Sequence, residues 1–341
     1  MAKIAVVGAG AWGTALACHA ARLEHEVALW ALEPEVVEEV NSRHRNSAYL
    51  PERPIPDAVR ATADASEAVA GARVVILVPP SKHLRAVSAR LRGSLGRQAA
   101  LVVATKGIEE ETLALMSEVL AQTLPEVASE RVGFLSGPSF AKEVAQGLPT
   151  DVVLASPGGR TARKVQPLLH ASAFRVYSSE DPIGVQVGGA VKNVVAVAAG
   201  ACDGLGLGHN ARAALLTRGL AEITRLGVAL GADPLTFLGM SGVGDLILTC
   251  TGDLSRNRTL GKEVAGGADP RAFLAGRRSV AEGFSTSAAA RALARKLDVD
   301  MPITENVYHV LHRGRPLAEA ARMLVSRGFK EELAGIRSRR S

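Results

Sequence analysis

Residues 3–13 have the sequence KIAVVGAGAWG, an apolar run followed directly by the spacing G-x-G-x-x-G. Gly8 permits a tight turn, Gly10 lets the backbone approach phosphates, and Gly13 lets helix and strand pack closely, which together make a cradle for a dinucleotide pyrophosphate. The alternative is a glycine-rich turn without a ligand, because 34 glycines scatter such patterns. Residues 15–18, ALAC, continue as a helix and favour the cradle.

A second apolar run and an acidic residue follow at the spacing that this cradle requires. Residues 26–30, EVALW, predict the next strand, and Glu33 stands twenty residues beyond Gly13. A carboxylate at that offset is placed to bind the ribose hydroxyls of a dinucleotide. The sequence therefore predicts a βαβ unit that binds NAD or NADP.

Further apolar runs alternate with helical patterns up to about residue 180. They are continuous, as in strands buried on both faces of a largely parallel sheet, and cover residues 73–78, 99–104, 131–136, 151–155 and 174–177. Residues 43–62, with three prolines, predict an extended loop. Beyond residue 181, Ala/Leu-rich helical patterns take over. We expect an α/β fold: a Rossmann-type dinucleotide-binding domain over 1–181 and an all-helical substrate-binding and catalytic domain over 182–341.

Composition narrows the class of protein. Hydrophobic content of 47% with 22% charged residues is ordinary for a globular enzyme. No run of eighteen apolar residues predicts a membrane span, and the chain enters its first strand without a signal peptide. Cys18, Cys202 and Cys250 are isolated, which favours a reducing compartment, so we expect a cytoplasmic protein.

The net charge of +6 does not indicate a nucleic-acid partner. The basic residues are spread along the chain and aromatic residues make up only 4% of it. The densest basic run, at residues 337–340, predicts a solvated terminus, with loose contact to anionic lipid as the alternative.

Two stretches of the first domain carry polar groups where such a sheet binds ligands. Lys106 follows the run at 99–104 and could hydrogen-bond a carbonyl or phosphate; an ordinary surface lysine is the alternative. Residues 135–143, LSGPSFAKE, predict a strand end, a tight turn and a helix that begins near Pro138. Ser139 and the helix start suit polar or anionic substrate atoms, with a plain helix cap as the alternative.

Residues 188–200, GGAVKNVVAVAAG, are the least usual stretch. A helix that is small and apolar on all faces should be buried, yet it contains Lys192 and Asn193. Burial lowers the pKa of a lysine towards the range useful for proton transfer. The alternatives are a lysine that reaches solvent, or one that pairs with a buried carboxylate for structure.

The segment that follows offers a partner for this lysine and donors for a phosphate. Asp245 is a carboxylate in an apolar stretch, and Arg256 with Asn257 provides forked donors of the kind that clamp phosphate. A solvated basic turn is the alternative for the last two. His309 and His312 share a helix face without a third ligand, so no metal site is expected.

Together these residues resemble bacterial NAD(P)-dependent glycerol-3-phosphate dehydrogenase. The resemblance spans nearly the whole chain and rests on the segments GAGAWGTALA, ATKGIE, SGPSFAKEVAQGLPT, GGAVKNVVAVAAG, GVGDLILTCTGDLSRNR and VAEG, in that order. It implies reversible reduction of dihydroxyacetone phosphate to sn-glycerol 3-phosphate, the precursor of phospholipids, by a homodimer that needs no metal.

The resemblance also implies residue roles. Lys192 would be the catalytic acid/base, Lys106 would polarise the carbonyl, and Asp245 would orient both lysines. Substrate would bind at Lys106, Gly137, Ser139, Lys192, Asn193, Asp245, Thr249, Ser255, Arg256 and Asn257. The cofactor would bind at Gly8, Gly10, Ala11, Trp12, Gly13, Leu32, Glu33, Lys106, Ala141, Arg256, Val280 and Glu282.

Two positions depart from the family pattern. Ala11 replaces a serine that is frequent in the glycine loop. Leu32 stands where relatives often carry Arg or His, whose charge would neutralise the 2′-phosphate of NADP. With Glu33 beside it, the site should repel that phosphate, which predicts a preference for NAD(H), although Arg43 or Arg45 could still supply a cation.

Two other functions remain open from the residues. The first is a related 3-hydroxyacid dehydrogenase with the same folds and a helix-borne lysine; SGPSFAKE and LSRNR argue against it. The second is a non-catalytic dinucleotide sensor, which would have no reason to keep Lys192 and Asp245 in buried apolar segments.

Overall fold

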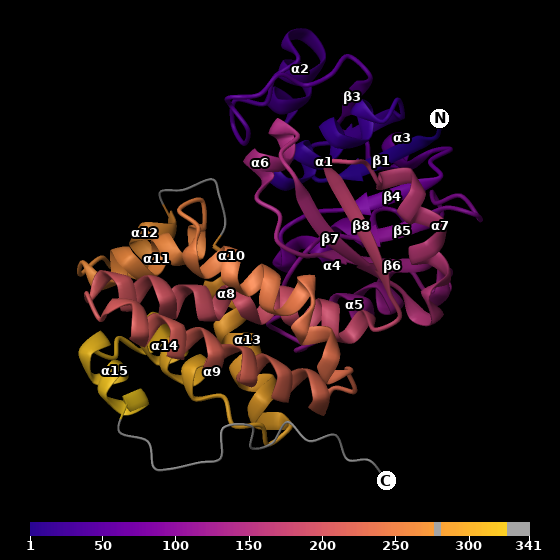
Figure 1. Cartoon of the computed structure of the whole chain (residues 1–341). Helices are drawn as coiled ribbons and strands as arrows, with labels where there is room; N and C mark the ends of the chain where they lie inside the picture. Colours follow the sequence, from indigo (N-terminus) through magenta and orange to yellow (C-terminus); the bar gives the residue numbers. More distant parts are fainter. Residues whose placement is uncertain (276–280, 326–341) are drawn as a thin grey trace. The chain divides into compact units, whose positions relative to one another are not determined.

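The apolar runs of the first half form one eight-stranded sheet in a computed structural model of the chain, which describes residues 1–275 and 281–325 (Figure 1). The strand order is β3-β2-β1-β4-β5-β6-β7-β8, and every neighbouring pair is parallel except β6 and β7. The strands are β1 (Lys3–Val7), β2 (Glu26–Trp30), β3 (Val59–Thr62), β4 (Val74–Leu77), β5 (Ala100–Val103), β6 (Val132–Ser136), β7 (Thr150–Ala155) and β8 (Phe174–Ser179). The predicted α/β architecture is confirmed.

The chain divides into two compact units. Unit 1 comprises residues 1–105 and 116–182, and unit 2 comprises residues 106–115 and 183–341. This division differs from the expected one at residues 106–115, which the sequence placed with the sheet. Ile108 and Leu115 are buried in the apolar core of unit 2, which explains the difference.

Helices connect the strands of unit 1. They are α1 (Ala11–Arg22), α2 (Pro34–Arg43), α3 (Ala65–Val69), α4 (Ser81–Ala89), α5 (Met116–Thr123), α6 (Ala141–Gln146) and α7 (Arg160–Leu169). Helix α6 begins at Ala141 rather than near Pro138, because the backbone is not helical at Gly137, with φ of 131°, or at the extended Phe140.

The segment from residue 43 to 62 is not a loop throughout, which corrects the expectation. Its end forms β3, whose residues VRAT alternate between buried and exposed positions. β3 is an edge strand that pairs only with β2. An edge strand needs no continuous apolar run, so the search for such runs missed it.

Unit 2 is helical and is built on α8 (Pro182–Gly204). The other described elements are α9 (Gly208–Ala229), the 3-10 turn Pro234–Leu238, the π-helical turn Met240–Gly244, α10 (Asp245–Thr251), α11 (Arg256–Ala265), α12 (Pro270–Ala275), α13 (Glu282–Lys296), α14 (Pro302–Arg313) and α15 (Leu317–Val325). Val280 and the basic run at 337–340 lie outside the described residues.

Helix α8 is the buried centre of unit 2, as its composition predicts. Among the residues from Gly184 to Cys202, only Ala198 is not fully buried. By length and composition α8 could cross a membrane, but 94% of its most apolar window is buried inside the structure. The core helix of a globular protein has the same properties, and α8 packs against α9 and α13 in one apolar cluster.

Candidate functional site

The glycine turn of unit 1 has the geometry of a pyrophosphate cradle. A Cβ at Gly13 would lie 1.8 Å from the carbonyl oxygen of Gly8, so α1 can approach β1 only with glycine at this position. A Cβ at Gly10 would meet nothing within 4 Å, which leaves the backbone open to a ligand. Gly10 also precedes the first turn of α1, and no side chain caps that turn. Its N–H groups are therefore available to phosphate oxygens.

A buried donor without a partner lies beside this cradle. The indole Nε1 of Trp12 is shielded from solvent and bonds to no described residue. Buried N–H groups are rarely left unpaired in proteins. The residues present at the cradle therefore fit a dinucleotide.

Glu33 is held by a residue that sequence reasoning missed. The hydroxyl of Tyr49 donates to Glu33 Oε1 over 2.6 Å. Asn46, in the same loop, is buried and donates to the carbonyl oxygen of Ala9 and the hydroxyl of Thr14, each over 2.8 Å. The loop is thus anchored to the glycine turn. Asn46 and Tyr49 belong to a stretch without periodicity, so only the folded chain reveals their role.

Leu32 and the two candidate cations of the neighbouring loop are exposed. Leu32 is 63% exposed, next to the carboxylate of Glu33. Arg43 and Arg45 are exposed as well. No described contact fixes either arginine near the position expected for the ribose.

Gly137 and Ser139 form a tight turn after β6. Gly137 adopts a φ of 131°, and a Cβ there would lie 2.9 Å from the Cα of Val152. The hydroxyl of Ser139 donates to the carbonyl oxygen of Gly137 over 3.0 Å. The neighbouring Ser136 is buried, and its hydroxyl has no partner among the described residues. Sequence reasoning missed Ser136, because nothing in the pattern separates it from a strand residue.

Unit 2 gathers two lysines on one buried carboxylate. Lys192 Nζ lies 2.6 Å from Asp245 Oδ1, and Lys106 Nζ lies 2.7 Å from Asp245 Oδ2. Lys192 also donates to the hydroxyl of Thr249 over 2.6 Å, and that hydroxyl donates to the carbonyl oxygen of Asp245. The pairing of Asp245 with a buried lysine, expected from the sequence, is present.

The cluster contains two lysines but only one carboxylate, so one positive charge is not neutralised. Asp245 is 1% exposed and Lys192 is 6% exposed, so water screens neither of them. A buried ion pair contributes little net stability, and a second cation on the same carboxylate contributes less. Structural need alone does not account for this arrangement, which suits a site where negative charge develops.

Burial and neighbouring charges shift the proton affinities in this cluster. Burial lowers the pKa of Lys192 to about 8, although the Asp245 carboxylate acts to raise it. Burial acts to raise the pKa of Asp245, but the charges of Lys106 and Lys192 outweigh it and hold that pKa below its ordinary value. Lys192 can therefore exchange a proton near neutral pH while Asp245 stays ionised.

A second polar chain lies beside the cluster. Asn257 Nδ2 donates to Asn193 Oδ1 over 2.8 Å, and the backbone N–H of Gly283 donates to Asn257 Oδ1 over 2.9 Å. Ser255 caps α11 by accepting the N–H of Arg258. Burial lowers the pKa of Arg256, and the nearby Glu282 carboxylate opposes this effect.

The predicted site positions are divided between the two units. The predicted positions in unit 1 are Gly8, Gly10, Ala11, Trp12, Gly13, Leu32, Glu33, Gly137, Ser139 and Ala141; those in unit 2 are Lys106, Lys192, Asn193, Asp245, Thr249, Ser255, Arg256, Asn257 and Glu282. His309 and His312 bond to Glu305 and Ser287 respectively. The described residues contain no metal-binding group of three His, Cys, Asp or Glu side chains.

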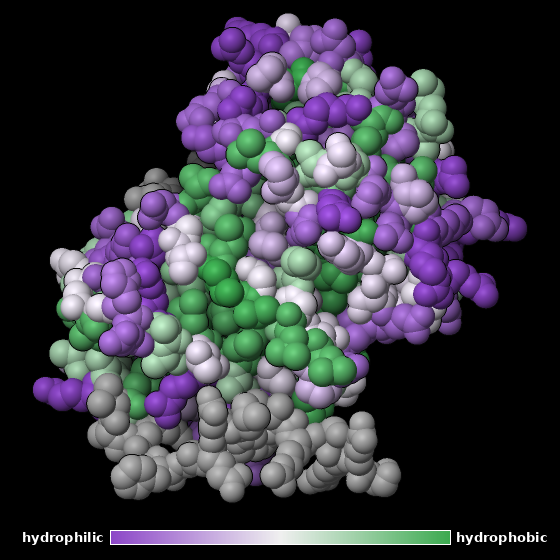
Figure 2. Space-filling view, viewed as in Figure 1, coloured by the Kyte–Doolittle hydropathy of each residue, from purple (hydrophilic) through white to green (hydrophobic). Residues whose placement is uncertain are grey.

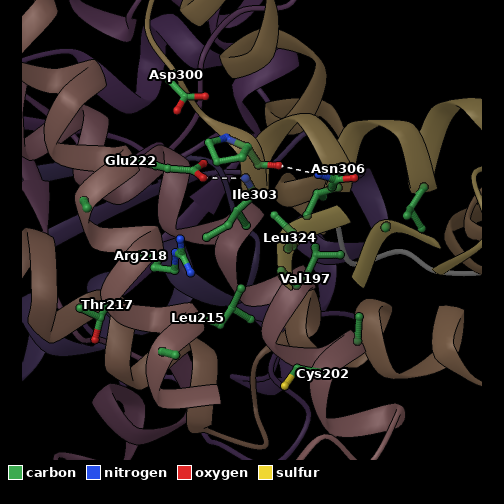
Figure 3. A pocket seen from close by; sticks show the side chains of 18 of the residues that line it. Val197, Cys202, Leu215, Thr217, Arg218, Glu222, Asp300, Ile303, Asn306 and Leu324 are labelled. Atoms are coloured by element: carbon green, nitrogen blue, oxygen red, sulfur yellow. Dashed lines mark hydrogen bonds between the residues drawn. The ribbon is translucent and has the colours of Figure 1, made fainter. Parts of the chain in front are cut away.

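Unit 2 also contains a large cavity of about 1570 Å³ apart from this cluster. Its walls come from α8, α9, α11, α14 and α15 and from the segments that follow α9 and α13, and they are mainly apolar. Glu222 lies at one side of it and accepts the N–H of Ile303 over 2.6 Å (Figure 3). The lining includes neither Lys192 nor Asp245, so the cavity is separate from the lysine cluster.

Comparisons with known proteins match both units. The profile of the NAD-dependent glycerol-3-phosphate dehydrogenase N-terminus matches residues 3–162, and that of its C-terminus matches residues 181–322. The chain is 49% identical over 330 residues to a glycerol-3-phosphate dehydrogenase [NAD(P)+] of Geobacter sp. strain M21, covering 97% of this chain and 98% of the relative. It is 49% identical over 331 residues to that of Myxococcus xanthus, covering 97% and 99%.

A solved structure supports the same assignment. The crystal structure of glycerol-3-phosphate dehydrogenase from Coxiella burnetii superposes with a TM-score of 0.91 at 38% identity, covering 96% of this chain and 99% of that one. The glycine cradle, the lysine cluster and these matches over both units lead to one conclusion: the chain belongs to the NAD-dependent glycerol-3-phosphate dehydrogenase family.

Proposed function

We propose that this protein catalyses reversible hydride transfer between NAD(P)H and dihydroxyacetone phosphate, which gives sn-glycerol 3-phosphate for glycerophospholipid synthesis. The observation that carries the proposal is the Lys192–Asp245–Lys106 cluster, in which Lys192 has a pKa of about 8. The names of the relatives, glycerol-3-phosphate dehydrogenase [NAD(P)+], support the substrate.

The lysines act on the carbonyl oxygen of the substrate. A bound nicotinamide supplies the hydride to the carbonyl carbon. Lys192 donates a proton from Nζ to the oxygen as alkoxide charge develops there, and takes the proton back in the reverse direction. Lys106 stabilises the same charge, while Asp245 holds both ammonium groups through short ion pairs.

The phosphate of the substrate would be bound mainly by Arg256 and Asn257 of unit 2, next to Ser255 in the sequence. The guanidinium of Arg256 and the NH2 group of Asn257 both donate hydrogen bonds to an anion. Thr249 was expected to share this work. Its hydroxyl contacts Lys192 and Asp245, so we assign it to orienting the catalytic lysine instead.

The first experiment follows NADH and NADPH oxidation separately on addition of dihydroxyacetone phosphate, with a 3-hydroxycarboxylic acid tested in the reverse direction. Lys192→Met keeps the length of the side chain and removes the ammonium, so kcat should fall about 10³-fold. Lys262→Met, which removes an exposed lysine from the same unit, should leave kcat unchanged. Turnover of the hydroxy acid alone would support the carboxylate alternative, and nucleotide binding without any turnover would support a sensor.

We further propose that the enzyme prefers NAD(H). Tyr49 holds the carboxylate of Glu33, and Leu32 offers no cation for a 2′-phosphate. A fixed carboxylate binds the two ribose hydroxyls and repels a phosphate. Leu32→Arg should shift the ratio of kcat/KM values towards NADPH by about tenfold or more. Leu205→Arg adds the same charge at an exposed leucine of unit 2 and should leave the ratio unchanged. A wild-type ratio that favours NADPH would contradict the proposal.

We also propose that the protein is a homodimer in the cytoplasm. Unit 2 exposes large apolar side chains, among them Leu235 at 68%, Leu238 at 67% and Ile247 at 50%, and Figure 2 shows apolar surface gathered over the helical unit. Exposed apolar patches mark interaction surfaces. Light scattering should give twice the chain mass of 35.5 kDa, and Leu238→Arg should lower the measured mass.

The cysteines bear on the compartment. The three free buried cysteines support a reducing compartment.

A further inference from the structure

The polar chain of Asn193, Asn257 and Gly283 has a fixed direction. Gly283 is the second residue of α13, so its backbone N–H has no acceptor within the helix. That N–H donates to Asn257 Oδ1 over 2.9 Å, and Asn257 Nδ2 donates to Asn193 Oδ1 over 2.8 Å. Gly283 and both asparagines are buried. The chain therefore begins at a helix terminus and ends inside α8.

A backbone N–H can only donate, and this decides how both amides are turned. Asn257 must present its oxygen to Gly283, so its NH2 group faces Asn193. Asn193 must then present its oxygen to Asn257, which turns its own NH2 group the other way. Without the Gly283 N–H, each amide could flip by exchanging oxygen and nitrogen.

The fixed direction leaves donors available. Each NH2 group carries two hydrogens. Asn257 Nδ2 gives one to Asn193, and Asn193 Nδ2 makes one long contact of 3.4 Å with the carbonyl oxygen of Gly189. Among the described residues, one hydrogen on each amide thus has no acceptor. A phosphate ester has only oxygen acceptors to offer, so these hydrogens match it.

The position of Gly283 explains why it is glycine. A Cβ there would lie 2.5 Å from the carbonyl oxygen of Asn193 and 2.9 Å from Asn257 Oδ1. The first is a backbone atom of α8, against which α13 packs here, and the second belongs to the polar chain itself. Even the smallest side chain would therefore push the two amides out of register.

We propose that Gly283 is a positioning residue, which fixes the flip of Asn257 and Asn193 so that both present N–H groups to the oxygens of a phosphorylated substrate. This inference rests on the proposed function, since it assigns both amides to the substrate. It adds that Gly283, which has no side chain, determines which atoms of the two amides face the substrate. Gly283 acts only through the two amides.

The first test compares two glycine substitutions that insert a methyl group against the same helix. Gly283→Ala disturbs Asn193, while Gly219→Ala places a Cβ 2.5 Å from Val195 Cγ1 of α8. Both should lower the melting temperature. Only Gly283→Ala should raise the KM for dihydroxyacetone phosphate and the Kd for glycerol 3-phosphate, each about tenfold, the loss expected for a charge-assisted hydrogen bond. The pH dependence of kcat should stay in place, because Lys192 is untouched.

The second test reverses the polarity of one amide and remains available if Gly283→Ala does not fold. Asn193→Asp keeps the acceptor for Asn257 and replaces the NH2 group by an anionic oxygen, whereas Asn193→Ala removes both the acceptor and the donor without adding charge. Calorimetric titration with glycerol 3-phosphate should show weaker binding for the Asp variant than for the Ala variant. Equal or tighter binding by the Asp variant would overturn the assigned polarity.

The outcomes separate this inference from the proposed function. Wild-type protein that neither turns over dihydroxyacetone phosphate nor binds glycerol 3-phosphate contradicts the proposed function itself. Active wild-type protein whose folded Gly283→Ala variant keeps both constants overturns only the role of Gly283.

Discussion

At the scale of single residues, function rests on side chains that are costly to bury. Lys192 and Lys106 place two positive charges on the carboxylate of Asp245, and Lys192 and Asp245 have almost no access to water. The burial that weakens such a cluster as a structural element also moves the pKa of Lys192 to about 8. Burial therefore both weakens the ion pairs as a source of stability and suits Lys192 to proton transfer.

This pKa predicts opposite pH dependences for the two directions of reaction. Reduction needs protonated Lys192, so its kcat should fall as the pH rises through about 8; oxidation needs neutral lysine and should gain over the same range. Asp245→Asn removes the charge that raises the pKa of Lys192, so both profiles should move to lower pH as activity drops. Stopped-flow rates from pH 6 to 10 check this, and profiles that stay in place in Asp245→Asn would contradict it.

At the scale of elements, helix α14 depends on a carboxylate from another helix. It begins at Pro302, which has no N–H, and its next two N–H groups donate to Glu222 of α9 over 2.6 and 3.1 Å. The hydroxyl of Thr304 donates to the same carboxylate. Glu222 therefore serves as a remote cap and is 1% exposed. Burial raises its pKa to about 7, although the backbone bonds act to lower it.

Replacing this cap predicts a clear loss of stability. Glu222→Gln leaves one acceptor and turns an NH2 group towards the N–H donors, so the free energy of unfolding should fall by about 2 kcal/mol. Glu263→Gln, at an exposed position of α11, is the matched control and should change little. Urea unfolding followed by circular dichroism measures both. A midpoint for Glu222→Gln equal to that of the wild type would show that the cap contributes nothing.

The elements also show what the sequence can reveal. The strand β1 and the glycine turn were predictable, because Gly8, Gly10 and Gly13 meet local steric demands within a few residues. Strand β3 was missed, since an edge strand needs no continuous apolar run. The start of α6 was placed too early because Pro138 is a frequent first residue of helices, whereas the chain turns at Gly137 first.

The candidate site also contains residues that the sequence reveals and contacts that it does not. Lys192 and Asp245 were recognisable, because a charge inside an apolar segment is unusual wherever it occurs. The contact of Tyr49 with Glu33, the cap by Glu222 and the direction of the Asn193–Asn257 pair were not. Each of these joins segments that are far apart in sequence or lie in a loop, so no local period reveals them.

At the scale of the whole molecule, unit 1 should respond to acid through one histidine. His19 is buried and donates from Nε2 to the carbonyl oxygen of Leu169, and burial lowers its pKa to about 4. The unfolded chain takes up this proton near pH 6.5, so between 6.5 and 4 only the unfolded state is protonated. Stability is therefore lost as the pH falls through that window, by about 2 kcal/mol between pH 7 and 5.

The tryptophans make this loss measurable. The chain has two, Trp12 and Trp30, and both belong to unit 1. The melting temperature read from their fluorescence should drop from pH 7 to pH 5, and His19→Gln should reduce the drop while keeping a donor for Leu169. His209→Gln, at an exposed histidine of unit 2, should not. An equal drop in His19→Gln would assign the acid sensitivity to other groups.

The ten residues 106–115 have a consequence for anyone who wishes to cut this protein in two. They are inserted in the sequence of unit 1 but belong to unit 2, to which they contribute Lys106 and the core residues Ile108 and Leu115. A gene fragment that starts at residue 183 would encode a helical half with a gap in its core and without one of its lysines. A workable fragment joins residues 106–115 through a linker to residue 183, or carries them behind the helical half as a circular permutant of unit 2.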